Sequence, residues 1–337
     1  MTTIGVVTRG ERGSAFVRNL TARGYRVAVA DRAGAADMVK ALSAPRAVIL
    51  LASPGLDGLL AELLPRLEPG DVLADGDASR FSDTGRRTAW LRGSGVLFAG
   101  CAIAGRPRTI ERGPSYVVGG DRAAHRRLLP LLTATAARFQ NVPCVAYAGA
   151  GSAGHFAGQV HEELATAEAE LAAEAYALLG DRAVLRAWQA GEMITEPAVP
   201  KDRPGPVRPL TVTVAEIRAA WYAARAVAYA RAVERLRAAG AAYGWGMDLA
   251  AVTSAWRGGT ALAGRLLTYA REALTAMPDE GLLDDPYFAL TLRETRPAWR
   301  RVVCAAGRAG IPVPALATAA EPPVTASSFD AHPRLLR

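Results

Sequence analysis

The sequence predicts an α/β domain built on a doubly wound, mostly parallel sheet, followed by an all-helical domain. Up to about residue 151, short runs rich in β-branched residues alternate with stretches whose apolar residues recur at helical spacing. Beyond His155 these strand-like runs stop. Strands that alternate with helices in this way are typical of parallel βαβ units. The chain has 337 residues, 50% of them apolar, which is enough for two domains of about 150 residues each.

The amino-terminal domain is expected to span residues 1–153. Its expected strands are Thr3–Val7, Arg26–Ala30, Ala47–Leu51, Val72–Ala74, Val96–Ala99 and Tyr116–Gly119. Its expected helices are Ser14–Arg23, Leu56–Leu67, Asp83–Arg92 and Arg122–Arg138. Each helical stretch has apolar residues three and four positions apart, which places them on one helix face that can cover the sheet.

The carboxy-terminal domain is expected to span residues 154–337 and to be all-helical. Its first helix, His155–Leu179, contains no proline and is rich in good helix formers. Proline and glycine cluster between Pro197 and Pro209, which predicts a loop or linker. The remaining expected helices are Val214–Ala239, Leu249–Ala255, Ala261–Ala276 and Ala298–Ala309.

The charge of the chain does not indicate a nucleic-acid-binding protein. Lys plus Arg number 40 and Asp plus Glu 32, so the net charge is +8. Only Lys40 and Lys201 are lysines, and the arginines are spread along the whole chain, which indicates a compositional bias rather than a basic patch. No uncharged apolar run reaches about 18 residues. The expected partner is therefore a small molecule, with no nucleic acid and no membrane.

The cysteines and the amino terminus favour a reducing compartment. Cys101, Cys144 and Cys304 are far apart and form no CxxC pair, so neither a disulfide framework nor a metal site is expected. Residues 1–7 have no basic region before their apolar run, so no secretion signal is expected and the cytoplasm is the expected location.

A glycine-containing turn follows the first expected strand. Gly5, Val7, Arg9 and Gly10 belong to a sequence in which the middle glycine of a GxGxxG motif is Val7. Glycines at this place let the backbone approach a pyrophosphate at the helix amino terminus, where unpaired N–H groups favour anions. The turn therefore predicts dinucleotide binding. The alternative is a domain of this type in which the glycines serve only the turn.

The second and third strands end in residues that suit the adenosine half of such a cofactor. Asp31 can accept hydrogen bonds from a ribose and would repel a 2′-phosphate, which favours NAD over NADP. The neighbouring Arg32 could clamp that phosphate or stack on the adenine. Ala52 and Ser53, after the third strand, complete the expected cofactor-binding residues.

Several motifs in order along the chain resemble those of the 6-phosphogluconate dehydrogenase family. They are Asp75-Gly76, Ser82 to Arg87, Gly113-Pro114-Ser115, Gly154-His155-Phe156, Trp256-Arg257-Gly258-Gly259 and Trp299-Arg300-Arg301. The resemblance implies an NAD-binding Rossmann-type domain, an all-α domain of the 6-phosphogluconate dehydrogenase type, and a homodimer that packs through the helical domains. In that family, Asp at the end of the second strand accompanies a preference for NAD.

The chain departs from this family at the residues that carry its chemistry. Gly158 stands in place of the lysine that accepts a proton in the family, and Glu162 in place of an Asn. The family's catalytic Glu and phosphate-binding Tyr are replaced by Ala165 and Thr166. Lys201, in the Pro-rich stretch, either reaches the cleft as a substitute lysine or is an exposed loop residue.

The substrate loops depart as well. Ala78 replaces an Asn, and Ala104, Gly105 and Arg106 replace the Ser-Gly-Gly loop. Arg106 could bind an anionic group or a base ring, or merely close over a smaller pocket. Each lost cation or hydroxyl would leave a phosphate dianion short of a charged hydrogen bond worth about 1.5 to 3 kcal/mol. The expected substrate is therefore not 6-phosphogluconate.

Two titratable residues remain on the face of the long helix that carries the family's chemistry. Helical spacing places His161 and Glu162 on the same side as Gly158. An imidazole beside a carboxylate can act as a general base and acid pair. The competing interpretation is that His161 only packs against the first domain and Glu162 is a solvated charge.

These residues lead to three hypotheses of function. The first is an NAD-dependent oxidoreductase that acts on a secondary alcohol of a non-phosphorylated sugar, polyol or nucleoside-like substrate. The second is a redox-neutral dehydratase of a specialised biosynthetic pathway, in which transient oxidation acidifies a neighbouring C–H before water is eliminated. The third is a non-catalytic dinucleotide-binding descendant.

Overall fold

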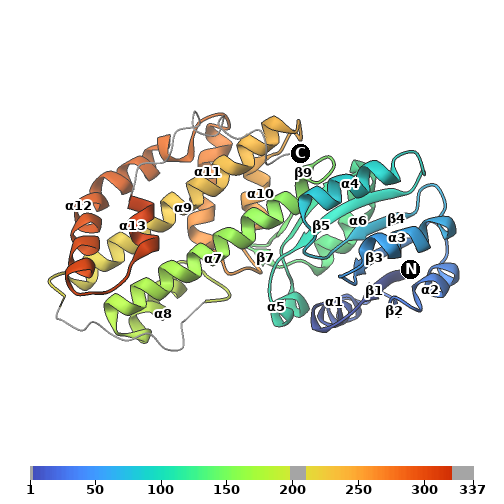
Figure 1. Ribbon diagram of the computed structural model, residues 1–337, viewed down its shortest axis with the longest axis horizontal. Helices are drawn as coiled ribbons and strands as arrows, with labels where there is room; N and C mark the ends of the chain where they lie inside the picture. The colour runs from blue at the N-terminus through green and yellow to red at the C-terminus, as the bar shows by residue number, and fades with distance from the viewer. Residues whose placement is uncertain (1–2, 198–209, 321–337) are drawn as a thin grey trace.

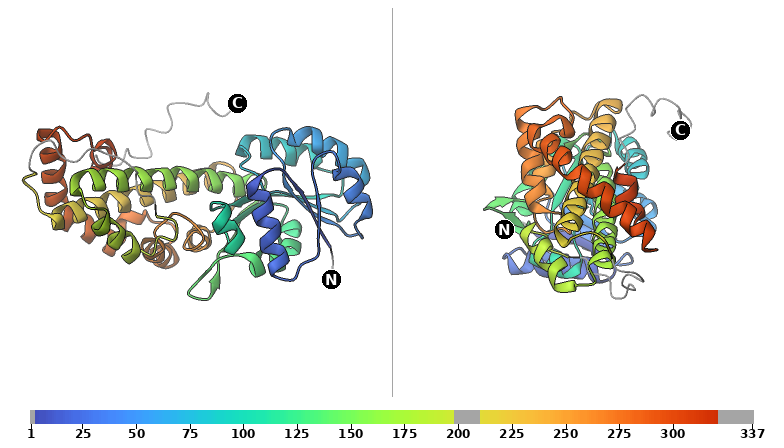
Figure 2. Two further views of the ribbon diagram at one scale, coloured as in Figure 1. Left: turned by 90° about the horizontal axis from the view of Figure 1, so that it is seen from below. Right: turned by 90° about the vertical axis from the view of Figure 1, so that its left-hand side faces the viewer.

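An α/β domain and a helical domain are joined by one long helix, α7 (Ala153–Leu179). The structure, a computed structural model, describes residues 3–197 and 210–320. Helix α7 starts against the sheet and runs the length of the helical domain, beside α9 (Figure 1; Figure 2, left). Within the described ranges, no helix has both the length and the apolar character needed to cross a bilayer.

The sheet of the first domain has seven strands in the order β2-β1-β3-β4-β5-β6-β9. They are β1 (Ile4–Thr8), β2 (Val27–Ala30), β3 (Ala47–Leu51), β4 (Val72–Asp75), β5 (Leu97–Ile103), β6 (Tyr116–Gly120) and β9 (Val145–Gly149). Strands β1 to β5 are parallel, whereas β6 is antiparallel to β5 and β9 is parallel to β6. The predicted doubly wound, mostly parallel sheet is confirmed.

The last part of the first domain, after β5, differs from the sequence prediction in three respects. Strand β9 was not expected, and neither was the small hairpin of β7 (Arg138–Phe139) and β8 (Val142–Pro143). The strand expected at Tyr116–Gly119 runs antiparallel to β5, because the short connection between them does not carry a helix across the sheet. This connection contains only the six-residue helix α5 (Pro107–Arg112) and its flanking loops.

Helices cover both faces of the sheet. They are α1 (Glu11–Ala22), α2 (Ala35–Ala41), α3 (Leu56–Leu63), α4 (Phe81–Leu91) and α6 (Arg122–Thr135). Helices α2 and α5 are too short to show a clear period, and the sequence did not predict them. The helix expected to reach Leu67 ends as the 3₁₀ turn η1 (Leu64–Arg66), where Pro65 has no N–H to continue the α-helical ladder.

Neighbouring residues of one strand enter different cores, as expected for a sheet covered on both faces. Val6 and Ile49 pack on one face, whereas Val7, Val48 and Leu50 pack on the other. All five are buried. Because both faces are apolar, the parallel strands are nearly continuous hydrophobic runs.

The second domain consists of helices only, as predicted. They are α8 (Arg182–Gly191), α9 (Val214–Ala242), α10 (Leu249–Ala255), α11 (Gly264–Ala276), α12 (Pro286–Arg308) and α13 (Pro314–Ala320), with the 3₁₀ turn η2 (Leu282–Asp284) before α12. Helices α8 and α13 were not predicted. Helix α12 begins at Pro286 rather than Ala298, because the internal Pro297 lies on the exposed side of the helix, where the freed carbonyl can meet water. The predicted Pro-rich loop lies mostly outside the described residues.

Two glycines allow α7 to contact the sheet closely. A Cβ on Gly119 of β6 would lie 2.2 Å from the Gly154 nitrogen, and a Cβ on Gly154 would lie 2.3 Å from the Gly119 nitrogen. Only glycine fits at either position, which gives a packing reason for the Gly154-His155-Phe156 motif. The expected domain boundary after residue 153 falls in the first turn of this helix and stays a prediction.

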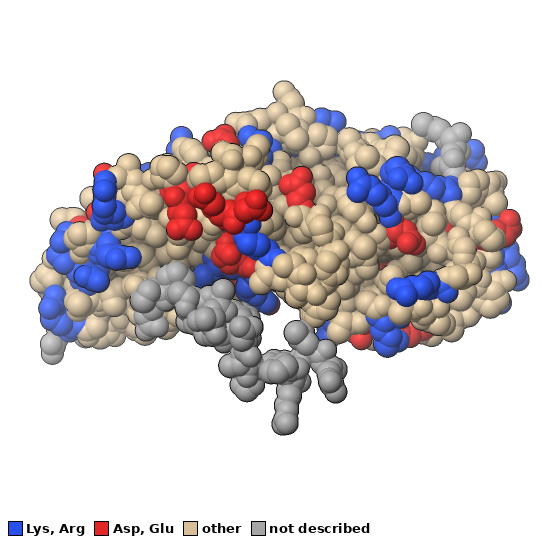
Figure 3. All heavy atoms as spheres, turned by 90° about the horizontal axis from the view of Figure 1, so that it is seen from above, with Lys and Arg blue, Asp and Glu red and all other residues tan. Residues whose placement is uncertain are grey.

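Acidic and basic side chains are mixed on the face of the molecule shown in Figure 3. Lys and Arg side chains lie in small groups between acidic groups over both domains, and they form no single continuous patch on that face. Within the described residues, no three His, Cys, Asp or Glu side chains are grouped to hold a metal ion.

Candidate active site

The turn from β1 to α1 has the geometry of an anion-binding cradle. Gly10 adopts φ 87°, a conformation that favours glycine, and no side chain caps the first turn of α1. A Cβ on Gly13 would lie 1.5 Å from Oγ1 of Thr8, so the start of the helix packs directly on the end of the strand. The first-turn N–H groups of α1 have no intrahelical acceptor and can bind a pyrophosphate.

The four residues predicted from this turn do not all face the cradle. Arg9 and Gly10 are exposed at its rim. Val7 is fully buried in the core, and a Cβ on Gly5 would meet Leu42 at 2.8 Å. Gly5 and Val7 therefore position the strand through packing, and Arg9 and Gly10 are the residues of this set that a cofactor can reach.

Asp31 and Arg32 are exposed at the end of β2, and they do not bind each other. Asp31 Oδ1 accepts a hydrogen bond from the Gly34 N–H at 2.9 Å, which holds the carboxylate in its own turn. The Arg32 guanidinium instead lies against the start of α3, where a Cβ on Gly55 would meet Nη1 at 2.2 Å. The carboxylate is thus fixed at the end of β2, and the guanidinium lies over Gly55 and Gly58.

Ala52 and Ser53, the residues predicted after β3, can make few contacts with a ligand. Ala52 is buried, and the Ser53 N–H donates to Asp77 Oδ2 at 2.8 Å. That N–H is therefore already occupied, and Ser53 can offer only its hydroxyl and carbonyl to a ligand. Ala78, predicted as a substrate residue, is exposed in the loop beside Asp77.

A buried polar network underlies this loop, and it was not predicted. Asp75, fully buried at the end of β4, pairs with Arg87 Nη1 at 3.1 Å, and burial raises the pKa of its carboxyl. His155 Nδ1 lies 2.6 Å from Thr84 Oγ1, and burial lowers the pKa of the imidazole. The family motifs at Asp75-Gly76, Ser82 to Arg87 and Gly154-His155-Phe156 contain these residues, so part of their similarity reflects the junction of the two domains.

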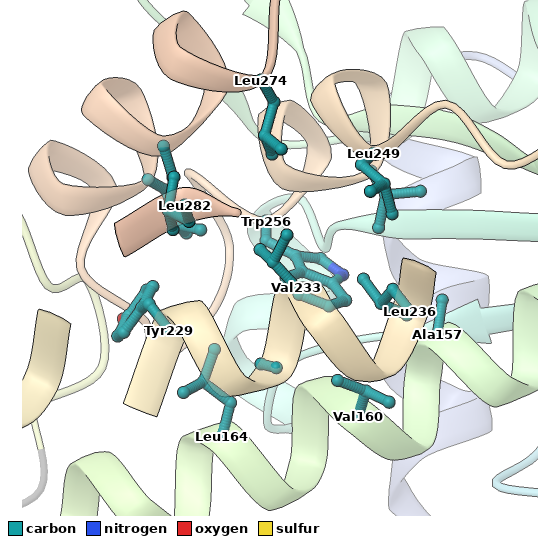
Figure 4. Packing of buried hydrophobic residues seen from close by; sticks show 14 of the residues in the cluster. Ala157, Val160, Leu164, Tyr229, Val233, Leu236, Leu249, Trp256, Leu274 and Leu282 are labelled. Carbon is teal, nitrogen blue, oxygen red and sulfur yellow. The ribbon is translucent and has the colours of Figure 1, made fainter. Parts of the chain in front are cut away.

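His161 is buried on the inner face of α7. Its ring lies 5.5 Å from that of Trp256, which Figure 4 shows at the centre of the core formed by α7, α9 and α10. Neither ring nitrogen has a hydrogen-bond partner within the described residues, although Nδ1 lies 3.4 Å from Glu162 Oε1. A buried, unsatisfied imidazole is costly unless a ligand supplies the partner.

Glu162 lies beside this imidazole, with its side chain 71% exposed. The contact with His161 lowers the pKa of the Glu162 carboxyl, and the positive charge of Arg12 adds to that effect. The pair predicted from helical spacing is thus brought together by the structure, with a buried imidazole and an exposed, ionised carboxylate.

Arg12 and Glu196 hold the predicted substrate loop, and no sequence pattern predicted either residue. Arg12, from the first turn of α1, donates through Nη2 to the Ile103 carbonyl at 2.8 Å and through Nη1 to the Gly105 carbonyl at 2.9 Å. Glu196 accepts from the Arg106 N–H at 3.1 Å, and its other carboxylate oxygen lies 4.0 Å from the guanidinium. Ala104 is buried below them. The loop is therefore tied to the first turn of α1, which also forms the cofactor cradle.

Gly158 lies where α7 contacts β5. A Cβ at this position would lie 2.6 Å from the Ala102 Cβ. Any side chain at position 158 would therefore require α7 or β5 to shift.

Gly158→Lys is expected to destabilise the fold by about 1 to 3 kcal/mol, the usual cost of overpacking, without creating turnover of 6-phosphogluconate. Chemical denaturation measures the first effect and a dehydrogenase assay the second. Gln159→Lys, one position along the same helix, is the control. A Gly158→Lys enzyme that is fully stable and oxidises 6-phosphogluconate would contradict this.

Two predicted substrate residues remain, Thr166 and Lys201. Thr166 is exposed, and its hydroxyl bonds to the Glu162 carbonyl at 2.9 Å, as Ser and Thr often do within helices. Lys201 lies outside the described residues.

This combination defines a class of protein. A Rossmann domain with a dinucleotide-binding turn is followed by a helical domain whose first helix contributes the candidate catalytic pair. Comparison of the sequence with known families indicates the same class of protein. Residues 3–149 match the NAD binding domain of 6-phosphogluconate dehydrogenase, and residues 199–321 match the 6-phosphogluconate dehydrogenase C-terminal domain. The chain belongs to the 6-phosphogluconate dehydrogenase family.

Comparison with individual relatives also supports membership of this family. The chain is 27% identical to a decarboxylating 6-phosphogluconate dehydrogenase of Chlamydia pneumoniae, over 94% of this chain and 88% of that protein. It is 29% identical to the Caenorhabditis elegans enzyme, over 84% and 76% of the two chains. The solved Plasmodium falciparum 6-phosphogluconate dehydrogenase has the same fold, with a TM-score of 0.84 over 94% of this chain and 91% of that one, at 18% identity.

The chain is also shorter than these relatives. The alignment with the Chlamydia pneumoniae protein spans 423 positions, whereas this chain has 337 residues. That relative therefore has segments with no counterpart here.

Proposed function

We propose that the protein is an NAD-dependent oxidoreductase that acts on a secondary alcohol of a non-phosphorylated sugar, polyol or nucleoside-like substrate. The cradle at Gly10 and the first turn of α1 has the shape and free N–H groups that a pyrophosphate needs. The observation that favours a change of chemistry is Gly158, because a side chain there would meet Ala102 and the proton-accepting lysine that the family resemblance implies at this position is absent.

The nicotinamide cofactor, when bound, supplies a hydride acceptor, and the chain supplies the proton chemistry and the orientation. The unpartnered Nε2 of His161 is suited to take the proton of a substrate hydroxyl. The Glu162 carboxylate, whose Oε1 lies 3.4 Å from Nδ1, helps to orient the imidazole ring. Arg12 holds the Ile103 and Gly105 carbonyls and so fixes the loop that closes over the substrate.

The experiment that tests this function has two stages. The purified protein is denatured and any released dinucleotide identified, and the intact protein is then screened with NAD against sugars, polyols and nucleosides. Formation of reduced cofactor with an unphosphorylated member of the panel is the expected result. Turnover without net reduction would favour the dehydratase. Dinucleotide binding with no turnover of any panel member would favour the non-catalytic descendant.

The preference for NAD over NADP depends on Asp31. Because its carboxylate is held at the end of β2, it would repel a 2′-phosphate, and Arg32 lies over Gly55 and Gly58. Asp31→Asn is expected to shift the ratio of the two dissociation constants towards NADP by about tenfold, which corresponds to about 1.4 kcal/mol.

Isothermal titration of both dinucleotides measures this ratio. Asp37→Asn, an exposed substitution in α2, is the matched control and should leave the ratio unchanged. An unchanged ratio in Asp31→Asn, or tighter binding of NADP by the unmodified protein, would disprove the preference.

We also propose that the protein is a homodimer that packs through its helical domains, as the family resemblance implies. Light scattering on the purified protein is expected to give twice the chain mass.

A further inference from the structure

A hollow of about 400 Å³ lies in the helical domain, between α9, α11 and α12 and beside the end of α8. Charged and aromatic residues dominate its lining, namely Glu192, Arg218, Tyr222, Arg265, Tyr269 and Tyr287. Its volume is within the range of about 300 to 1,000 Å³ that small-molecule sites have. None of the residues assigned above to the cofactor or the substrate lines it.

The inner end of the hollow is acidic. Glu192 is buried, with its side chain 7% exposed, and its Oε2 accepts no hydrogen bond although it lies 3.5 Å from Arg225 Nη1. Arg225 also donates two hydrogen bonds to Glu168, from Nε at 2.8 Å and from Nη2 at 3.0 Å. The Arg225 guanidinium thus pairs with two buried carboxylates, those of Glu168 and Glu192. Glu192, the carboxylate that lines the hollow, retains an oxygen that can accept a hydrogen bond.

The outer end is basic and the walls are aromatic. Arg218 and Arg265 are exposed and form no ion pair with any residue that the structure describes. Both lie close enough to Glu192 for their charges to act on its carboxyl. The ring centroids of Tyr269 and Tyr287 lie 4.2 Å apart, and the Tyr222 and Tyr287 hydroxyls are hydrogen-bonded to each other.

We propose that this hollow binds a small zwitterion, an α-amino acid with an apolar or aromatic side chain. Its ammonium group donates to Glu192 Oε2, its carboxylate pairs with Arg218 and Arg265, and its side chain packs on the tyrosine rings. A simple anion would leave Glu192 Oε2 without a hydrogen bond, and a simple amine would meet two arginines that form no ion pair at the entrance. A ligand with both charges uses all three parts of the lining.

Calorimetric titration of the full-length protein, without dinucleotide or substrate, tests this independently of the proposed reaction. The probes are L-phenylalanine, L-tyrosine and L-leucine, with phenethylamine and 3-phenylpropionate as partners that each lack one charge. At least one amino acid is expected to bind, and at least tenfold more tightly than either single-charge probe. Glu192→Gln and Arg218→Gln are each expected to weaken that binding at least tenfold.

Arg186→Gln, an exposed substitution on α8 away from the hollow, is the control and should not alter binding. Arg218 is also exposed, so its replacement reports on binding even if Glu192→Gln proves unstable. Failure of all three amino acids to bind would overturn the proposal. So would 3-phenylpropionate or phenethylamine binding as tightly as the best amino acid, because one charge would then suffice.

Discussion

Replacing His161 with Phe is expected to lower kcat by about two to four orders of magnitude, the range that general acid and base catalysis contributes. The phenyl ring preserves the packing on Trp256, so the loss reports on the imidazole rather than on a cavity. Dinucleotide affinity should be unchanged, since the cradle at Gly10 is formed by β1 and α1. Steady-state kinetics with the substrate found in the screen, together with cofactor titration, measure both quantities.

The same variant has a spectroscopic signature. Contact with His161 lowers the pKa of the Glu162 carboxyl, so removal of the imidazole should raise that pKa towards its ordinary value, as carboxyl NMR can show. Glu163→Gln is the matched control, because Glu163 is adjacent on α7 but pairs with Arg235 at the surface. Unchanged kcat in His161→Phe would remove His161 from the mechanism.

Arg225→Ala is expected to cost about 3 to 5 kcal/mol of the free energy of unfolding, because it leaves buried carboxylates without their cation. Glu168 would keep only the Tyr229 hydroxyl, which donates to it at 2.6 Å, and Glu192 would lose the guanidinium that lies 3.5 Å away. Burial already raises the pKa of Glu192, and loss of Arg225 would raise it further.

The loss of unfolding free energy in Arg225→Ala is expected to depend on pH. A carboxyl whose pKa is raised in the folded state binds its proton more readily there than in the unfolded chain, so the deficit should shrink as the pH falls from about 7.5 to about 5. Denaturant unfolding at both pH values measures it. Arg218→Ala, an exposed change on the same helix, should cost less than about 0.5 kcal/mol.

A double variant separates lost charge pairing from lost packing. Arg225→Met combined with Glu168→Leu removes the cation and one of its two carboxylates, and it should be more stable than Arg225→Ala. A cost below about 1 kcal/mol for Arg225→Ala, or a deficit that grows on acidification, would contradict the account of this buried cluster.

Most of the fold was predictable because its signals are local. The strand at Ala47–Leu51 and the helix at Leu249–Ala255 have the predicted bounds, since each is a short apolar or amphipathic run with clear flanking residues. The short helix α5 and the reversal of β6 were not predictable, because they depend on how the chain returns alongside β5. Likewise, α12 extends through Pro297 because that residue lies on an exposed surface, which periodicity does not reveal.

The candidate site was predictable where neighbours in space are neighbours in sequence. His161 and Glu162 lie on one helix, and the Gly10 turn follows one strand, so local sequence together with the family resemblance predicts them. Arg12 and Glu196 are about ninety residues from the loop that they hold, and no local pattern connects them. The buried role of Gly5 and Val7 also depends on tertiary packing, which places them in the sheet core rather than at the cofactor.

We infer that this chain has a nicotinamide dinucleotide site but no site for a sugar phosphate. Titration of the purified protein with NAD and, separately, with 6-phosphogluconate tests both parts. Saturable binding of NAD and no saturable binding of 6-phosphogluconate over the same concentrations is the predicted result. Tight binding of 6-phosphogluconate, or the failure of any nicotinamide dinucleotide to bind, would contradict it.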